Sequence, residues 1–333
     1  MKPEPQSRAT NGMSRRRVWQ AMLPLLCPAV PALAQGSGVT KLIVPFTPGA
    51  SNDVIGRLMA EAMARRTGKS WIVENRPGAG SMLGAEVVAK SAPDGNTLLL
   101  CASANMGILP AIQKSMRYAV ERDFTFFVRI ASSPFALAVS TQLPANNFSD
   151  FVRLAKSKPG SIRIGSAGVG ALDYMGASML QSQLGLDLNI IPYKGMAPVL
   201  NDLRAGHIDA AIVSPATIRP MAIDGKVKVL AVLDKQRNDV LPQVPSSADL
   251  GHPNLIVGNW WGIAGPAKMP AALVASLSQA MMEVLGDPAF HKTLKDKGFE
   301  PAAISGDAFA SFVRADLKAW KTLATQANIT MDE

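Results

Sequence analysis

Short apolar runs alternate with amphipathic segments along most of the chain. Residues 42–44 are branched apolar side chains, and such a run predicts a buried strand. A turn follows, and apolar residues then recur on one helical face over 54–63. Ser51 or Asn52 can cap that helix at its start, and Gly68 suits its end. This alternation is typical of βαβ units and parallel sheets.

The same unit repeats, and the predicted strands fall into two series. The first series has strands at 42–44, 71–74, 97–100 and 126–130, with a helix from about Ser81. The second has strands at 135–139, 162–165, 188–191, 210–213 and 227–233, with helices at 148–156, 170–184 and 197–204. The last third predicts mainly helices, at 270–285 and from Ser305 onward. Two α/β series predict two lobes, and we expect the chain to pass between them near residues 135 and 235.

The first 34 residues have the pattern of an export signal. Three arginines at 15–17 precede an apolar stretch at 18–30, which closes on Ala32-Leu33-Ala34 before Gln35. The stretch is interrupted by prolines and is shorter than the roughly 20 apolar residues that span a bilayer. We therefore predict a signal peptide at 1–34, cleaved after Ala34, and a mature chain soluble in the periplasm. The general secretion (Sec) route is favoured, and the arginine cluster leaves the twin-arginine route open.

The excess of basic residues does not indicate a nucleic-acid partner. The chain has 34 Lys and Arg against 25 Asp and Glu, for a formal net charge of +9. Part of this excess lies in the predicted signal peptide, and the remaining basic residues are scattered. A nucleic-acid backbone requires a dense basic patch, commonly with aromatic residues between the charges. The sequence therefore predicts a mildly basic solvated surface and no nucleic acid.

Two glycine-rich turns each lie between a predicted strand and a predicted helix. One spans 45–53 and the other spans 165–171. Backbone N–H groups at a helix start have no partner within the helix and the dipole there is positive, so such turns bind carboxylate or phosphate. Ligands of open α/β sheets also lie beyond the carboxyl ends of strands, where both turns fall. Glycines also simply permit tight turns, but one such turn in each lobe favours a shared anion site.

Motifs for catalysis, metals and nucleotides are scarce. Segment 78–84 follows a strand, but its glycine spacing departs from the dinucleotide fingerprint and the acidic residue after the next strand is missing. His207, His252 and His291 are not at metal-ligand spacing. Cys101, alone in the predicted mature chain, is expected to be a buried hydrophobe without a disulfide. The sequence thus predicts binding without catalysis, with no cofactor, catalytic residue or metal ligand.

Several longer motifs run through the chain. They are I-V-P-F at 43–46 with Gly49 and Asp53, V-E-N-R-P-G-A-G at 73–80, A-P-D-G-N-T-L at 92–98, S-A-G-V-G at 166–170, P-Y-K-G at 192–195 and W-W-G-I-A-G-P at 260–266. Together they resemble the periplasmic receptors of tripartite tricarboxylate transport, the Bug or TctC-like solute-binding proteins, over essentially the whole predicted mature chain.

The resemblance implies a fold and a function. The fold is a two-lobed α/β architecture like that of type II periplasmic binding proteins, with a mainly parallel or mixed sheet in each lobe. The tail returns to the first lobe, so that lobe 1 comprises 35–135 plus 236–333 and lobe 2 comprises 136–235. Such a receptor captures a small carboxylate-bearing organic acid in the cleft between its lobes and delivers it to membrane permease subunits, without catalysis. We expect a monomer.

The resemblance also implies which residues hold the ligand. Backbone and hydroxyl donors of the two glycine-rich loops grip a carboxylate, and Asp53 orients its loop instead of touching the anion. Weaker contacts to the distal end of the ligand are expected from Ser103, Asn105 and Ser214. The full predicted set is Thr47, Gly49, Ala50, Ser51, Asn52, Asp53, Ser103, Asn105, Ser166, Ala167, Gly168, Gly170, Ala171, Tyr174 and Ser214.

Three positions depart from the usual pattern of the family. Ala50 stands in place of a glycine, Ala171 in place of a Ser or Thr, and Tyr174 near the place of a common His. One hydroxyl donor is therefore missing. The change leaves room for a larger or more apolar acid than the usual dicarboxylate.

Two other functions stay open. A sensor that presents the bound acid to a membrane signalling kinase would use the same site. An exported hydrolase or lyase on the same lobes would need a nucleophile and a base within about 3 Å of each other.

Overall fold

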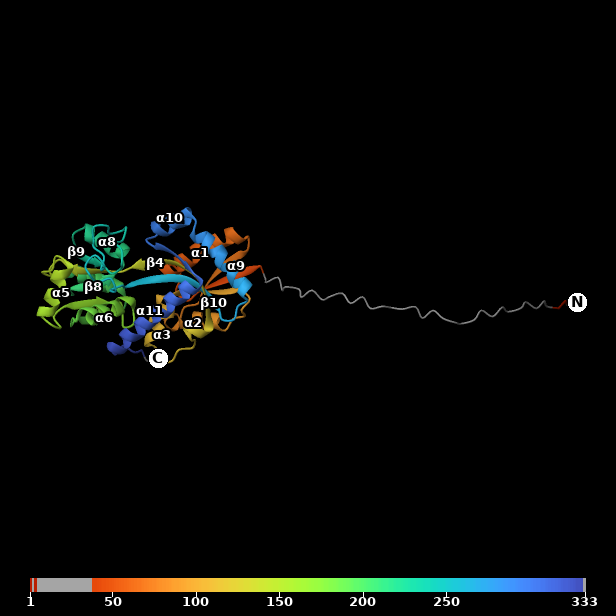
Figure 1. The fold of residues 1–333 in the computed structure, drawn as a ribbon, viewed down its shortest axis with the longest axis horizontal. Coiled ribbons are helices and arrows are strands. Elements are labelled where there is room, and N and C mark those ends of the chain that lie inside the picture. Colours follow the sequence, from red (N-terminus) through yellow and green to blue (C-terminus); the bar gives the residue numbers. More distant parts are fainter. Residues whose placement is uncertain (2, 5–37, 332–333) are drawn as a thin grey trace. The chain divides into compact units, whose positions relative to one another are not determined.

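The computed structural model describes residue 1, residues 3–4 and residues 38–331. The predicted cleavage site after Ala34 lies outside the described residues. Residues 38–331 form two mixed β-sheets, each flanked by its own helices (Figure 1). The predicted α/β class with mixed sheets is confirmed.

The first sheet has six strands, and it combines an N-terminal set with a C-terminal pair. Its order is β11 (Glu300–Ser305), β4 (Phe124–Pro134), β10 (Gly258–Pro266), β3 (Thr97–Ala102), β1 (Val39–Val44) and β2 (Ser70–Asn75). Strand β1 runs parallel to β2 and β3, whereas β10 is antiparallel to β3 and β4, and β11 is antiparallel to β4. The carboxyl ends of β1, β2 and β3 therefore lie at one edge.

Helices cover both faces of this sheet. They are α1 (Ser51–Thr67), the short turn η1 (Ala79–Ser81), α2 (Met82–Ala89), the π-helical turn η2 (Ala104–Ile108), α3 (Leu109–Ile112), α4 (Val120–Asp123), α9 (Ala271–Leu285), α10 (Pro288–Asp296) and α11 (Gly306–Gln326). One face packs against α1, α9 and α10, and its largest buried side chain is Trp261. The other face packs against α2 and α11, around Phe309.

The second sheet has five strands. Its order is β7 (Asn189–Pro192), β6 (Arg163–Ser166), β8 (Ala210–Val213), β5 (Ala136–Ser140) and β9 (Val227–Val232). Its helices are α5 (Phe148–Ser157), α6 (Leu172–Leu184), α7 (Met196–Ala205) and α8 (Pro215–Ile223). Strand β6 is parallel to β7 and β8, and β5 is antiparallel to β8 and β9. The loop that follows β6 is the second glycine-rich turn.

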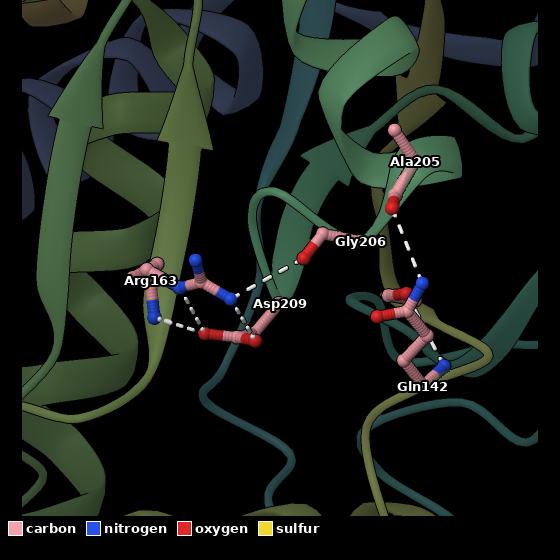
Figure 2. Close-up of polar contacts among 6 residues, drawn as sticks. Gln142, Arg163, Ala205, Gly206 and Asp209 are labelled. Carbon is pink, nitrogen blue, oxygen red and sulfur yellow. Dashed lines mark hydrogen bonds and ion pairs between the residues drawn. The ribbon is translucent and has the colours of Figure 1, made fainter.

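A forked ion pair fixes the beginning of β6, at the end of the strand away from that turn (Figure 2). The Arg163 guanidinium donates to both carboxylate oxygens of Asp209, at 3.0 and 2.9 Å, and the Arg163 backbone N–H donates to the same group at 2.8 Å. Nearby, the Gln142 amide donates to the Ala205 carbonyl oxygen at 3.2 Å. Because planar guanidinium–carboxylate pairs are directional, this contact sets the register between β6 and β8.

Three segments lie side by side where the chain passes between the sheets. The Phe135 N–H donates to the Val257 carbonyl oxygen at 2.8 Å, the Leu233 N–H donates to the Phe135 carbonyl oxygen at 2.8 Å, and the Val257 N–H donates to the Leu233 carbonyl oxygen at 2.9 Å. Leu255 and Val257 pack within the core of the second sheet. The stretch 234–257 thus remains with the second sheet before β10 begins.

The prediction of a mainly helical last third was incomplete, because that third also contributes β10 and β11. Strand β10 reads G-N-W-W-G-I-A-G-P, with glycines and a proline that are poor strand formers. It is stable because it lies centrally between β3 and β4, where its backbone pairs on both sides. Packing requires the glycine at position 262, because a Cβ there would lie 2.4 Å from the Phe309 ring.

Candidate functional site

The first glycine-rich loop joins β1 to α1, and Asp53 holds it in place. The Asp53 carboxylate accepts from the Gly49 N–H at 3.0 Å, from Arg57 Nε at 2.8 Å and from Asn75 Nδ2 at 2.9 Å. Asn75 Nδ2 also donates to the Phe46 carbonyl oxygen at 3.1 Å, which ties the loop to the end of β2. The Arg57 hydrogen bond is the main reason that the pKa of Asp53 falls from 3.8 to about 2. Asp53 therefore stays ionised and orients the loop.

The second glycine-rich loop joins β6 to α6, and Asp173 holds it. The Asp173 carboxylate accepts from the Ala167 N–H, and it is 4% exposed. The Ala167 carbonyl oxygen accepts from the Gly195 N–H at 3.0 Å, and the Ser166 carbonyl oxygen accepts from the Tyr193 N–H at 2.8 Å. Burial raises the pKa of Asp173, and backbone N–H groups oppose that shift. The P-Y-K-G segment at 192–195 thus holds the loop through backbone hydrogen bonds.

Both helices begin at an alanine. Ala50 is the N-cap of α1, Ala171 is the N-cap of α6, and neither helix start receives a side-chain cap hydrogen bond. A Ser, Thr, Asp or Asn at such a position would cap the first N–H groups itself. With alanine there, the first N–H groups of α1 are left to an external acceptor, whereas in α6 the Asp173 carboxylate itself accepts from the N–H groups of Asp173 and Tyr174. Each loop is thus chemically suited to a carboxylate.

The glycines of the second loop have backbone angles that favour glycine. Gly168 has a φ of +145° and Gly170 a φ of +79°. A Cβ at Gly170 would also lie 2.7 Å from the Ile112 side chain and 2.9 Å from the Met331 sulfur. Residues from α3 and from the C-terminal segment therefore form an apolar wall beside this loop.

The predicted side chains fall into different environments. Thr47 and Ser51 are exposed, whereas Asn52 Oδ1 accepts from the Trp261 indole N–H. Ser166 is fully buried at the end of β6, and among the described residues its hydroxyl has no hydrogen-bond partner. Tyr174 is half-buried in the first turn of α6.

The three distal residues are occupied by structural contacts. Asn105 is completely buried; its side-chain oxygen accepts from the Ala102 N–H at 2.8 Å, so it lies at the end of β3 and inside the core. The Ser103 hydroxyl donates to Asn259 Oδ1 at 2.8 Å. Ser214 is the N-cap of α8, where its hydroxyl meets Thr217 Oγ1 at 2.7 Å. The side-chain hydrogen bonds of Asn105 are thus with the backbone of β3 and not with either loop.

Sequence reasoning missed Arg57, Asn75 and Asp173, which hold the loops in shape. A signal was present, because each helix carries an aspartate in its first turn, two or three residues after its alanine cap. An aspartate there is favoured by the helix dipole and can also reach back to the preceding loop. An aspartate in the first turn of each helix was therefore informative about loop geometry.

Metal clusters, a reactive cysteine and membrane-spanning helices are all absent from the part of the chain that the structure describes. Within 38–331, no group of three or more His, Cys, Asp and Glu side chains is arranged to hold a metal ion. Burial strongly raises the pKa of the Cys101 thiol, as expected of a small buried hydrophobe and not of a nucleophile. No helix of the described chain has both the length and the apolar character needed to cross a membrane.

The family model for the tripartite tricarboxylate transporter family receptor, TctC, matches residues 55–329. The chain belongs to this family. A TctC receptor is a solute-binding protein and not an enzyme, so the predicted class is confirmed and the hydrolase or lyase alternative is excluded.

Solved structures of similar proteins agree with this assignment. A periplasmic transporter protein is 31% identical, with a TM-score of 0.73 over 90% of this chain and 100% of that one. Rpa4515 of R. palustris, solved with adipate, is 28% identical, with a TM-score of 0.72 over 87% and 97% of the two chains. MatC of Rhodopseudomonas palustris, solved with bound malate, is 28% identical, with a TM-score of 0.68 over 86% and 98%.

Proposed function

We propose that this TctC receptor binds a small organic acid between the 47–53 and 166–171 loops, with one carboxylate at each helix start. The single observation that supports this is the matched pair of alanine-capped helices, each preceded by a loop that an aspartate holds in shape. The adipate and malate bound by similar receptors are dicarboxylates. A ligand with a carboxylate at each end matches two uncapped helix starts.

The proposal also divides the molecule into two lobes. The first lobe comprises the first sheet with its helices, and the second lobe comprises the second sheet together with the stretch 234–257. Phe135, Leu233 and Val257 form the crossing between them, supported by their mutual hydrogen bonds. The lobes close on the acid, and the loaded receptor then docks on membrane permease subunits as a monomer.

The ligand is expected to carry more apolar surface than malate does. Ala171 provides no hydroxyl at the start of α6, and Ile112 and Met331 lie beside Gly170. Apolar side chains next to the anion site favour an acid with a carbon chain over a short hydroxylated one. Adipate is therefore expected to bind more tightly than malate.

A thermal-shift screen of linear and branched dicarboxylates, followed by calorimetric titration, tests the binding. A ligand at about 100 times its Kd stabilises the folded state by about 2.7 kcal/mol, which such a screen detects. Gly168→Ala tests the site, because Gly168 has a positive φ of +145° and a Cβ there would meet only the Tyr193 carbonyl oxygen, at an ordinary contact distance of 3.6 Å. Gly185→Ala is the matched control: Gly185 also has a positive φ and open space, but it lies at the other end of α6.

We expect Gly168→Ala to weaken binding of the best acid at least about tenfold and Gly185→Ala to leave it unchanged. Equal affinities in the two folded variants would show that the acid binds elsewhere. The export prediction has its own test: mass spectrometry of periplasmic protein should give a chain that begins at Gln35, and a retained 1–34 segment would contradict it.

A further inference from the structure

A cavity lies beside the crossing segments, and the two glycine-rich loops do not line it. It has a volume of about 450 Å³ and is bounded by β4, the start of β10, α6 and α11. We call it the hinge cavity and define it by Arg129, Asp234, Trp260, Phe312, Asp316 and Trp320. None of the predicted ligand residues lines it. Its chemistry therefore needs its own explanation.

Arg129 of β4 is a partly buried cation. Its Nε is inaccessible to solvent and has no partner among the described residues. Its guanidinium carbon lies 4.4 Å from the centre of the Phe312 ring, which attracts the charge but accepts no conventional N–H···O bond. Burial lowers the pKa of Arg129, as expected for a desolvated cation. A buried donor of this kind is costly unless an acceptor reaches it.

The acidic residues of the cavity are not paired with Arg129 at ion-pair distance. Both oxygens of Asp316 accept indole N–H groups, from Trp260 and from Trp320, each at 3.0 Å. Asp234 Oδ1 accepts from the Lys235 N–H at 2.7 Å. Burial raises the pKa of Asp234 and of Asp316, although the Arg129 charge attracts both carboxylates and Lys235 also attracts Asp234. The cavity therefore places Arg129 Nε, a donor unpartnered within the described chain, close to two carboxylates.

We propose that the hinge cavity binds a small zwitterion, an α-amino acid with an apolar side chain, whose carboxylate accepts from Arg129 and whose ammonium group donates to Asp234. Such a ligand supplies the acceptor that Arg129 Nε lacks among the described residues, and it adds no net charge to a partly buried cluster. Met179, Ile256 and Phe312 provide the apolar surface for its side chain. This second site does not depend on the identity of the acid bound at the two loops.

The probe is para-fluorophenylalanine, observed by fluorine NMR with the full mature chain. Two analogues isolate the charges: para-fluorophenylpropanoate lacks the ammonium group, and para-fluorophenethylamine lacks the carboxylate. The zwitterion is expected to bind and both analogues to bind at least about tenfold more weakly. The measurement is repeated in Gly168→Ala and in the presence of saturating adipate or malate, and binding is expected to persist in each case.

Four variants connect the signal to the cavity. Arg129→Gln and Asp234→Asn each remove one charge and are expected to weaken binding at least about tenfold. Ala319→Phe fills the cavity from an exposed position of α11 and keeps both charges, so it tests the site even where Arg129→Gln fails to fold. Arg122→Gln, at an exposed arginine just before β4, is the matched control and should bind normally.

Several results overturn the proposal. They are an absence of zwitterion binding up to about 10 mM, equal binding of an analogue, displacement of the probe by the dicarboxylate, and unchanged binding in Ala319→Phe.

Discussion

The two glycine-rich loops are alike at their helix starts and differ in what holds them. Directly at the first loop, Asp53 forms a hydrogen-bonded cluster with the Arg57 cation and the Asn75 amide. Asp173 accepts backbone N–H groups in a buried setting, and the charged pair of that strand, Arg163 with Asp209, lies at the opposite end of β6. The first loop thus depends on side-chain electrostatics, and the second depends on backbone geometry and packing.

This difference has a consequence for the proposed acid site. At the first loop the half-exposed Arg57 is paired with the Asp53 carboxylate, and low pH and salt both weaken such an ion pair. The second loop has a glycine backbone that an acid can approach closely, next to apolar residues. We therefore expect the first loop to govern the dependence of affinity on pH and salt, and the second to govern selectivity among acids.

The largest contrast is expected between equivalent glycine substitutions. Gly170→Val should lower the free energy of unfolding by about 2–5 kcal/mol, because it combines a left-handed φ with a clash against Ile112 and Met331. Gly49→Val should cost only about 1–2 kcal/mol, since Gly49 has a φ of +87° but open space around it. Urea unfolding measures the free energy lost in each variant. Equal losses would show that the clash with Ile112 and Met331 adds no cost at Gly170.

The two aspartates should respond to pH with opposite signs. The pKa of Asp53 is lowered from 3.8 to about 2, so its stabilisation is present above that ordinary value and is lost as pH falls toward 2. The pKa of Asp173 is raised, so its contribution is full below its ordinary value of 3.8 and is lost as pH rises through the raised pKa.

Asp53→Asn and Asp173→Asn test this contrast. At neutral pH, Asp53→Asn should cost about 1–3 kcal/mol, because it breaks charge-assisted hydrogen bonds to Arg57 and Gly49. Asp173→Asn should cost less, since the amide oxygen still accepts from Ala167 and no buried charge remains. The measurement is the unfolding free energy of both variants over a pH series. A larger loss in Asp173→Asn than in Asp53→Asn at neutral pH would contradict the expected order.

A smaller effect is expected from restoring a cap. Ala171→Ser and Ala50→Ser should each stabilise the protein by about 1 kcal/mol, because a serine hydroxyl accepts an N–H of the first turn. Ala171→Ser should also shift preference toward short dicarboxylates, because the hydroxyl can donate to the ligand. Calorimetry with malate and adipate measures the shift, and an unchanged ratio of the two affinities would argue against a selectivity role for the second loop.

The smallest effects are expected at the exposed hydroxyls of the first loop. Thr47→Ala and Ser51→Ala should each change the unfolding free energy by less than about 0.5 kcal/mol. Their effect on affinity should also be modest, because the proposed grip on the anion comes from backbone N–H groups. A loss of affinity above about tenfold in either variant would show that side-chain hydroxyls hold the acid instead.

Much of the fold followed from the sequence where local pattern and tertiary environment agree. Branched apolar runs predicted β1, β3 and β8, and the structure has strands at these places. Strand β10 was missed because its glycines and proline oppose strand formation, and its place between β3 and β4 overrides that preference. Local pattern carries no information about such non-local pairing.

For the candidate site, the sequence indicated both loops and the orienting role of Asp53. It could not indicate that Asn75 reaches Asp53 from the next strand, because that contact depends on the parallel pairing of β1 with β2. It also suggested Asn105, which the structure buries at the end of β3. A polar residue after a strand can face a cleft or satisfy the strand's own backbone, and only the packing of η2 decides between the two.

The sequence by itself determined the alternation of strands and helices, the two glycine-rich turns and the family, because each of these is encoded in residues close together in the chain. The tertiary structure alone decided that β10 and β11 complete the first sheet, that Ile112 and Met331 stand beside Gly170, and that Arg129 shares a cavity with Asp234 and Asp316. These contacts join residues distant in sequence. They form because burying apolar surface brings together segments whose local patterns do not identify one another.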